Sequence, residues 1–295
     1  MRSGVLAGAA LAVMLTATGA RAATPEAVTV STDWLAGRLN EPDLVLLHVG
    51  EEGGYKAGHI PGARFVRLAD IAVDVDGRSL QNPSAEDLRR RLAALGITDR
   101  SRVVVYFADD WVSPATRVLF ALQTAGLGPR ADLLDGGLGK WRREGRATTQ
   151  AVPPPAVPGS LAPFQLRPTV VDADFVRAHA GQPGYALIDA RAPVFYDGLS
   201  PSGAHGHMQR GHIPGARNLA FTSVARDDLT FKSPEELTAL FRKAGVKPGD
   251  KAIVYCHIGQ QGTAVVAAAR AAGVEAVLYD GSFEDWTLRG LPVEQ

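Results

Sequence analysis

The alternation of apolar and polar stretches along the chain predicts strands and helices in turn. Residues 103–107 and 252–255 are short runs rich in β-branched and aromatic residues, which are typical of buried strands. Residues 84–95 and 233–244 show the spacing of amphipathic helices, and each begins beside a serine and a proline and ends near a glycine. Strands that alternate with helices favour a mostly parallel sheet with helices on both faces, which is the doubly wound α/β class.

One seven-residue segment occurs twice in the chain. Gly58–Arg64 and Gly211–Arg217 both read Gly-His-Ile-Pro-Gly-Ala-Arg. Around this segment the two halves align element by element: 44–50 with 185–191, 103–107 with 252–256, and 134–137 with 279–282, followed in turn by Trp141 and Trp286. A repeat of this length indicates two copies of one supersecondary unit.

The sequence therefore predicts two tandem doubly wound α/β domains, over 24–147 and 164–295. Residues 148–163 contain five prolines, which indicates an extended linker between them.

The halves differ by one insertion. Leu47 and Ile188 are 141 positions apart, whereas Gly58 and Gly211 are 153 positions apart. The second half thus carries 12 extra residues, which lie between Arg191 and Gly211. Extra residues on one half alone predict that this half performs the specialised work.

The first 22 residues have the pattern of a secretory signal peptide. Arg2 supplies a positive charge, residues 4–19 are uncharged and apolar, and Ala20-Arg21-Ala22 forms a small-x-small cleavage site. We expect a mature chain that starts near Ala23, is exported to the periplasm or secreted, and is free of the membrane after cleavage. The alternative is an uncleaved anchor, although the apolar run is short for a membrane span.

Composition excludes several classes of function. Lys and Arg together number 31, as do Asp and Glu, so no global field attracts nucleic acid or anionic lipid. With 46% hydrophobic residues the chain can bury ordinary cores, which excludes disorder. Its single cysteine, Cys256, excludes an intramolecular disulfide and any Cys-x-x-Cys centre.

Cys256 directly follows a predicted buried strand and precedes a polar, glycine-containing loop. Ligands of open α/β sheets bind just beyond the carboxyl ends of strands. The N–H groups of such a loop and the start of the helix near Thr263 both favour a thiolate, so we expect a lowered thiol pKa and a nucleophilic Cys256. The alternative is a small buried hydrophobic residue.

The repeated heptapeptide, the Asp-Gly-Gly and Asp-Gly-Ser segments before the tryptophans, and the single cysteine loop of the second half resemble the rhodanese sulfurtransferases. The resemblance covers residues 28–292 and implies a rhodanese-like fold for each half. It also implies that the N-terminal domain is silent, because Phe107 stands where Cys256 stands and His48 and Gly50 replace Asp189 and Arg191.

The activity that this resemblance implies is sulfane-sulfur transfer. The Cys256 thiolate would attack the outer sulfur of thiosulfate, expel sulfite and hold the sulfur as a persulfide, which cyanide or a small thiol then removes. The scheme needs no metal or organic cofactor. We expect a monomeric enzyme whose partners are a small sulfur donor and a thiophilic acceptor. The persulfide would be cradled by the backbone of the loop: His257, Ile258, Gly259, Gln260 and Gln261.

The sequence departs from well-studied thiosulfate-using members at the anion contacts. The loop has His257 and Ile258 where they carry basic side chains, and Val194 and Phe195 stand in the region of a further arginine. Arg191 remains as the anion contact, so we expect its loss to impair donor turnover with little loss of stability. Asp189 either orients Arg191 or the loop, or ends its strand, and 3-mercaptopyruvate is the second candidate donor.

Three other interpretations remain open at this point. A phosphatase would need an arginine at position 262, which is Gly262. An exported binding or sensor module could keep the fold without using the thiol. Finally, His205, His207, Met208 and His212 could hold copper or zinc, although clustered histidines in a Gly/Ser-rich loop are more often solvated or hydrogen-bonded.

Overall fold

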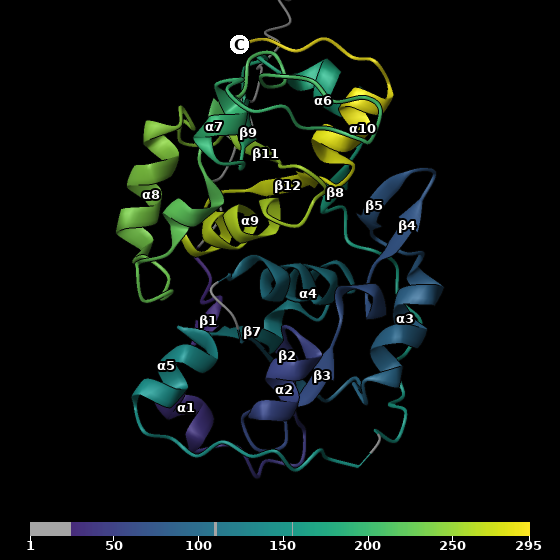
Figure 1. The fold of residues 1–295 in the computed structure, drawn as a ribbon, viewed down its shortest axis with the longest axis vertical. Coiled ribbons are helices and arrows are strands. Elements are labelled where there is room, and N and C mark those ends of the chain that lie inside the picture. Colours follow the sequence, from purple (N-terminus) through teal and green to yellow (C-terminus); the bar gives the residue numbers. More distant parts are fainter. Residues whose placement is uncertain (1–24, 109–110, 155) are drawn as a thin grey trace, which may run out of the picture.

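Two α/β units of similar construction lie one above the other in Figure 1. The computed structural model describes residues 25–108, 111–154 and 156–295, so the predicted signal peptide at 1–22 lies outside the described residues. The predicted pair of tandem doubly wound domains is confirmed: each unit is a five-stranded, all-parallel sheet with helices around it.

The sheet of the N-terminal domain has the order β1-β7-β6-β2-β3. Its strands are β1 (Thr29–Val30), β2 (Leu44–Val49), β3 (Arg64–Val66), β6 (Arg102–Phe107) and β7 (Ala131–Leu134). The helices are α1 (Thr32–Ala36), α2 (Glu52–Ala57), α3 (Ala85–Ala94), α4 (Ser113–Thr124) and α5 (Gly137–Arg143). A short antiparallel hairpin, β4 (Val73–Val75) with β5 (Arg78–Gln81), stands apart from this sheet.

The C-terminal sheet repeats this arrangement in the order β10-β9-β11-β12-β8. Its strands are β8 (Val170–Val171), β9 (Tyr185–Asp189), β10 (Arg217–Asn218), β11 (Lys251–Tyr255) and β12 (Ala276–Tyr279). The helices are α6 (Ala173–His179), α7 (Pro193–Tyr196), α8 (Pro234–Lys243), α9 (Gly262–Ala271) and α10 (Ser282–Leu288).

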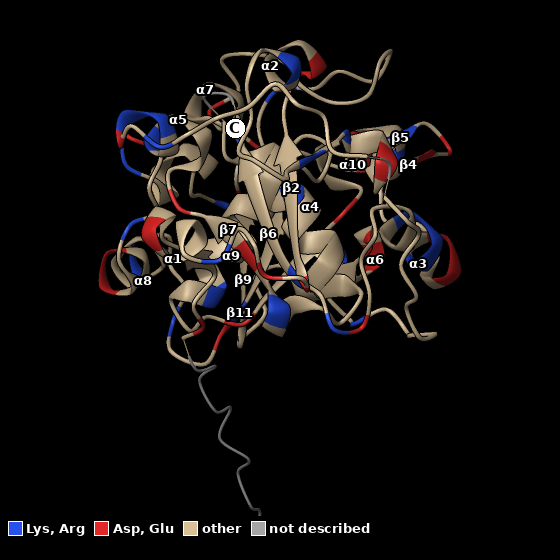
Figure 2. Ribbon diagram, turned by 90° about the horizontal axis from the view of Figure 1, so that it is seen from below, with Lys and Arg blue, Asp and Glu red and all other residues tan. Residues whose placement is uncertain are grey.

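Alternate strand residues face opposite sides of each sheet, which is why the strands are apolar throughout. In the N-terminal domain Leu46 and Val104 pack with α1 and α5, whereas Leu47 and Val105 pack with α3 and α4. Trp141 of α5 is buried against the first of these faces, as predicted. In Figure 2 the charged residues lie mainly on outer helices such as α3 and α8, with both signs present, and the central strands carry few.

The two predicted amphipathic helices are present with their caps. α3 begins after Ser84 and α8 after Ser233, and each serine side chain accepts a hydrogen bond from the backbone N–H three residues on. α3 buries Leu88 and Leu92, and α8 buries Leu237 and Phe241, in each case four residues apart on one helical face. None of the helices in the described part of the chain is long and apolar enough to cross a bilayer.

Helices α4 and α9 join the two domains. They pack side by side with their N-termini at the same end: Ser113 Oγ is 3.2 Å from Gln260 Nε2, and Thr116 Oγ1 is 2.8 Å from Thr263 Oγ1. Buried residues of both helices and both sheets form one continuous hydrophobic cluster. The interface is therefore built like a domain core, with few freedoms for relative motion.

The segment 148–163 runs along the N-terminal domain. Its described residues contain no helix or strand, apart from one bridge between Thr149 and His59. The Gly159 N–H donates to the Ala93 carbonyl at 2.7 Å, and Leu161 is buried. These contacts fasten an extended chain to the domain that precedes it.

The N-terminal domain has an aromatic ring at the position equivalent to Cys256. Phe107 ends β6 and is buried, and Gly137 lies against it with a positive φ of 54°. A Cβ atom on Gly137 would approach the Phe107 ring and carbonyl to 2.6 Å. Only glycine satisfies both the left-handed backbone and this close approach.

We predict that Gly137→Ser lowers the free energy of unfolding by about 2–4 kcal/mol, because it adds a steric clash to an unfavourable φ. The control is Gly145→Ser, since Gly145 has a φ of 71° but nothing within 4 Å of an added Cβ. Chemical denaturation of both variants measures the difference. Equal losses would show that the contact with Phe107 does not contribute.

Candidate active site

Cys256 is the first residue after β11, at the carboxyl end of the central strand of its sheet. Its thiol is free, and the side chain is fully buried. The loop 256–261 then turns directly into α9, whose first residue is Gly262. The predicted placement of the cysteine between a buried strand and the start of a helix is confirmed.

Hydrogen-bond donors of the loop surround the sulfur. The backbone N–H groups of Gly262, Ile258 and Gly259 and the side chain of Ser282 each lower the pKa of the thiol, so each favours the thiolate. The start of α9 adds the positive end of its helix dipole. Such an arrangement of N–H groups can stabilise a thiolate or the terminal sulfur of a persulfide.

The predicted direction of the thiol pKa is wrong. Burial raises the pKa of Cys256 above its ordinary value, and the N–H groups and Ser282 only partly offset this effect. The sequence shows the donors but does not show that Cys256 is fully removed from water, and desolvation destabilises the charged form. No cationic side chain of the described residues is among the groups that shift this pKa.

Ser282 is a site residue that sequence reasoning missed. Its Oγ accepts a hydrogen bond from the Cys256 N–H at 3.1 Å and donates to the Tyr279 carbonyl at 2.8 Å. Its φ is 54°, a conformation rare for a residue other than glycine. Gly137 holds the equivalent position in the silent domain, so the difference between the repeats was the signal that could have identified Ser282.

His257 is held by the insertion that only the C-terminal half possesses. Ser202 Oγ lies 2.5 Å from His257 Nδ1, and the Phe195 ring meets the imidazole edge-on at a centroid distance of 4.6 Å. Burial, followed by the charge of Arg191, lowers the pKa of His257 to about 4. The imidazole is therefore neutral at neutral pH and supplies no cation to the loop.

Arg191 does not lie where an anion from solvent could reach it. Its side chain and that of Asp189 are both completely buried, and Nη2 donates to Asp189 Oδ2 at 2.6 Å. The same Nη2 donates to the Gly211 carbonyl at 2.8 Å, and the guanidinium stacks on Phe283. The pairing with Asp189 favours a structural role for Arg191. Nη1 is buried without a hydrogen-bond partner among the described residues, and the anion contact stays a prediction.

Asp189 orients Arg191, which was one of its two predicted roles. It also accepts a hydrogen bond from the Tyr255 hydroxyl at 2.7 Å. In the silent domain His48 takes the place of Asp189 and bonds Tyr106 at 2.9 Å. In the same domain, Arg142 donates to the Gly58 carbonyl at 2.8 Å, as Arg191 does to the Gly211 carbonyl.

The far end of the loop borders an opening between the domains. Gln260 and Gln261 line a cavity of about 350 Å³ together with Trp111 and Ser113 of the silent domain. Trp111 is half-exposed and stacks on Phe221 at a centroid distance of 5.3 Å. Ile258 is partly buried, and only its backbone N–H is directed at the sulfur.

The histidines of the insertion do not assemble. His205 and His207 are exposed, whereas His212 is buried, stacks on Tyr196 and bonds its carbonyl through Nδ1 at 2.9 Å. His59 repeats this contact with Tyr55, which fits a turn-bracing role. Among residues 25–108, 111–154 and 156–295, no three His, Cys, Asp or Glu side chains gather as a metal site requires.

Comparison with known proteins identifies the family. The model of the rhodanese-like domain matches the chain twice, over residues 31–144 and 172–289. The chain is a member of the tandem-domain rhodanese family of sulfurtransferases. Both matches coincide with the two structural domains, so the resemblance seen in the repeated motifs is confirmed.

Several relatives of this rhodanese carry sulfur-related names. It is 36% identical over 85% of its length to the "Probable 3-mercaptopyruvate sulfurtransferase" of Pseudomonas aeruginosa, covering 92% of that protein. It is 34% identical over 85% of its length to the "Putative thiosulfate sulfurtransferase SseB" of Mycobacterium tuberculosis, covering 85% of it. A solved structure of EanB with ergothioneine superimposes with a TM-score of 0.79 at 25% identity, over 91% of this chain and 70% of that one.

We predict that Arg191→Ala reduces stability by about 3–5 kcal/mol, because it leaves the Asp189 carboxylate buried without its partner. The control is Arg177→Ala, which removes a surface ion pair with Asp174 and should change stability little. Thermal and denaturant unfolding measure both. A stable Arg191→Ala variant with impaired donor turnover would restore the anion contact predicted from the sequence.

We predict that the stability of the protein depends on pH through His257. Because its folded pKa of about 4 lies below its ordinary value of 6.5, its contribution to stability is complete above pH 6.5 and is lost as the pH falls toward 4. The loss for this residue is about 3 kcal/mol. His257→Gln should therefore lose less stability between pH 7 and 4.5 than the parent, whereas the exposed control His205→Gln should follow the parent. Parallel curves for His257→Gln and the parent would contradict the assignment.

Proposed function

We propose that this rhodanese transfers a sulfane sulfur from a small donor to a thiophilic acceptor through a persulfide on Cys256. The observation that carries the proposal is the position of the chain's single thiol, at the carboxyl end of β11 beside the N–H groups of Ile258, Gly259 and Gly262. The same donors serve a thiolate and a terminal persulfide sulfur, both of which are anionic acceptors.

The reaction with thiosulfate has two steps. The Cys256 thiolate attacks the outer sulfur, the S–S bond of thiosulfate breaks, and sulfite leaves with the bonding electron pair. An acceptor such as cyanide then attacks the outer sulfur of the persulfide, so that thiocyanate forms and the thiolate is regenerated. No net oxidation occurs and no cofactor takes part.

The charges around the loop favour 3-mercaptopyruvate as a second candidate donor. Arg191 is paired with Asp189, and His257 is neutral at neutral pH. A thiosulfate dianion would thus meet mainly backbone N–H groups, whereas 3-mercaptopyruvate brings a single carboxylate charge. Attack of the thiolate on its sulfur breaks the C–S bond and releases the enolate of pyruvate, which takes a proton.

We also propose that residues 1–22 direct export and that the mature protein is a periplasmic or secreted monomer. The support is the charge, apolar run and cleavage pattern of the sequence. N-terminal sequencing of the protein recovered from the periplasm of an expressing bacterium tests the cleavage site, and a retained Met1 would overturn it.

We predict that Cys256→Ser abolishes sulfur transfer while the fold survives, because a serine hydroxyl of similar size does not ionise at neutral pH. Intact-mass spectra of parent and variant after incubation with thiosulfate or with 3-mercaptopyruvate provide the measurement. The parent should gain one sulfur atom and lose it on addition of cyanide, and the variant should gain none. Retained thiocyanate production by Cys256→Ser would exclude this nucleophile.

A further inference from the structure

The silent domain contacts the cysteine loop through one buried side chain. Arg117 of α4 is fully buried, and its Nη1 is 3.4 Å from the Gly259 carbonyl oxygen and 2.6 Å from Asp280 Oδ1. Its Nη2 donates to the Leu80 carbonyl and lies 3.3 Å from Asn82 Oδ1. One guanidinium thus joins the hairpin, the loop and Asp280 across the domain interface.

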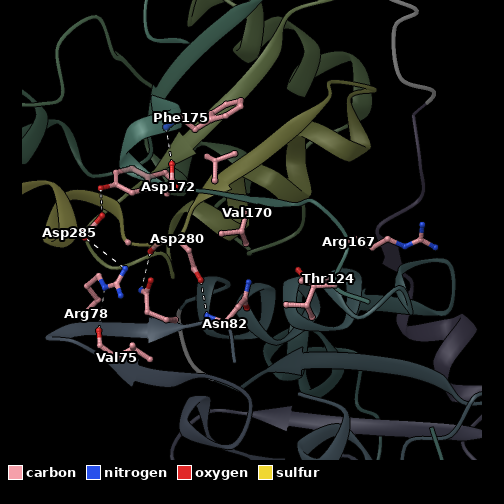
Figure 3. A pocket seen from close by; sticks show the side chains of 15 residues that line it. Val75, Arg78, Asn82, Thr124, Arg167, Val170, Asp172, Phe175, Asp280 and Asp285 are labelled. Atoms are coloured by element: carbon pink, nitrogen blue, oxygen red, sulfur yellow. Dashed lines mark hydrogen bonds and ion pairs between the residues drawn. The ribbon is translucent and has the colours of Figure 1, made fainter. Parts of the chain in front are cut away.

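Asp280 supports the same loop from the other side. It follows β12, and its Oδ2 accepts a hydrogen bond from the Asn82 N–H at 2.8 Å, a contact drawn in Figure 3. Its carbonyl oxygen and Oδ1 would lie 2.6 and 2.8 Å from a Cβ on Gly259. Gly259 also has a φ of 81°. Only a glycine therefore fits at this position of the loop, between Asp280 and Arg117.

The carbonyl groups at the start of the loop are directed away from the sulfur. The Cys256 and His257 carbonyls accept hydrogen bonds from the N–H groups of Phe283 and Glu284, each at 3.0 Å. Those two donors belong to α10 of the same domain. The Gly259 carbonyl has its donor in the other domain, and that donor is Arg117.

We propose that Arg117 is a positioning residue for the cysteine loop: by holding the Gly259 carbonyl it fixes the backbone of Gly259, and with it the direction of the Gly259 and Gly262 N–H groups toward Cys256. This inference uses Cys256 as the nucleophile of the proposed function and adds a part for the silent domain. Arg117 touches neither the sulfur nor a small donor, so it acts through the orientation of the loop.

The other charged groups near the loop do not supply this effect. Arg191 is paired with Asp189, and His257 is neutral at neutral pH. Among the described residues, the remaining cation at the loop is Arg117, which is paired with Asp280. Removal of Arg117 has two kinds of effect: it frees the Gly259 and Leu80 carbonyls and Asn82 Oδ1, and it leaves the Asp280 carboxylate without its ion pair. The double variant Arg117→Met with Asp280→Asn separates them, because it frees the carbonyl without creating a net charge.

The test measures the alkylation rate of Cys256 by iodoacetamide against pH, together with thermal unfolding. For Arg117→Met we expect a rate about tenfold lower at pH 7 and a midpoint about one pH unit higher, since the loop's N–H groups are then less well directed at the thiolate. The double variant should keep most of that shift. Arg117→Lys, which retains the charge but not the planar fork, should fall between Arg117→Met and the parent.

The matched control is Asp135→Asn. Asp135 accepts a hydrogen bond from the Phe231 N–H at 2.9 Å, so the variant weakens the domain interface away from the loop. It should lower the melting temperature without moving the alkylation midpoint.

Three results would overturn the positioning role: an Arg117→Met profile within twofold of the parent, full recovery in the double variant, or an equal shift in Asp135→Asn. If Arg117→Met does not fold, Arg117→Lys decides, and a midpoint equal to that of the parent overturns the role. Alkylation reports on the thiol whether or not it carries sulfur. Absence of any donor-dependent mass gain in the parent would therefore refute the proposed function and leave this result standing.

Discussion

The packing of α4 against α9 is the contact on which the active site depends. It merges the cores of the two domains into one hydrophobic cluster and fixes the direction in which α9 leaves the cysteine loop. A loop that orients N–H groups toward a sulfur needs a rigid support, because misplaced donors contribute little to stabilising a developing charge. The N-terminal domain, which has no cysteine, thus supports the loop that carries Cys256.

The two domains solve one structural problem with different residues. In the C-terminal domain Asp189, the last residue of β9, forms an ion pair with Arg191, two residues further along the chain. In the N-terminal domain His48 bonds the equivalent tyrosine, and Arg142 of helix α5 reaches the equivalent carbonyl. The backbone carbonyl requires a donor in both cases, while the identity of that donor is free to vary. This equivalence is why the Asp-x-Arg pattern, taken alone, does not indicate chemistry.

The sequence was sufficient for the fold and for the location of the site. The repeated heptapeptide and strand periodicity predicted both domains, and the position of Cys256 after a buried strand predicted the loop. What it could not show depends on burial and on contacts between distant segments. The raised pKa of Cys256, the pairing that compensates Arg191 and the bond from Ser202 to His257 all arise from tertiary packing. Periodicity along one segment does not report how completely another segment covers it.

The complete burial of Cys256 has a consequence for the lifetime of the enzyme in an oxidising environment. A buried thiol with a raised pKa reacts more slowly with oxidants than an exposed thiolate does. A persulfide places its outer sulfur about 2 Å beyond Sγ, so this atom is the one an acceptor meets first. The pocket can therefore discriminate between molecules by how far they must enter it. The outer sulfur of the persulfide is accessible to more partners than Sγ of Cys256.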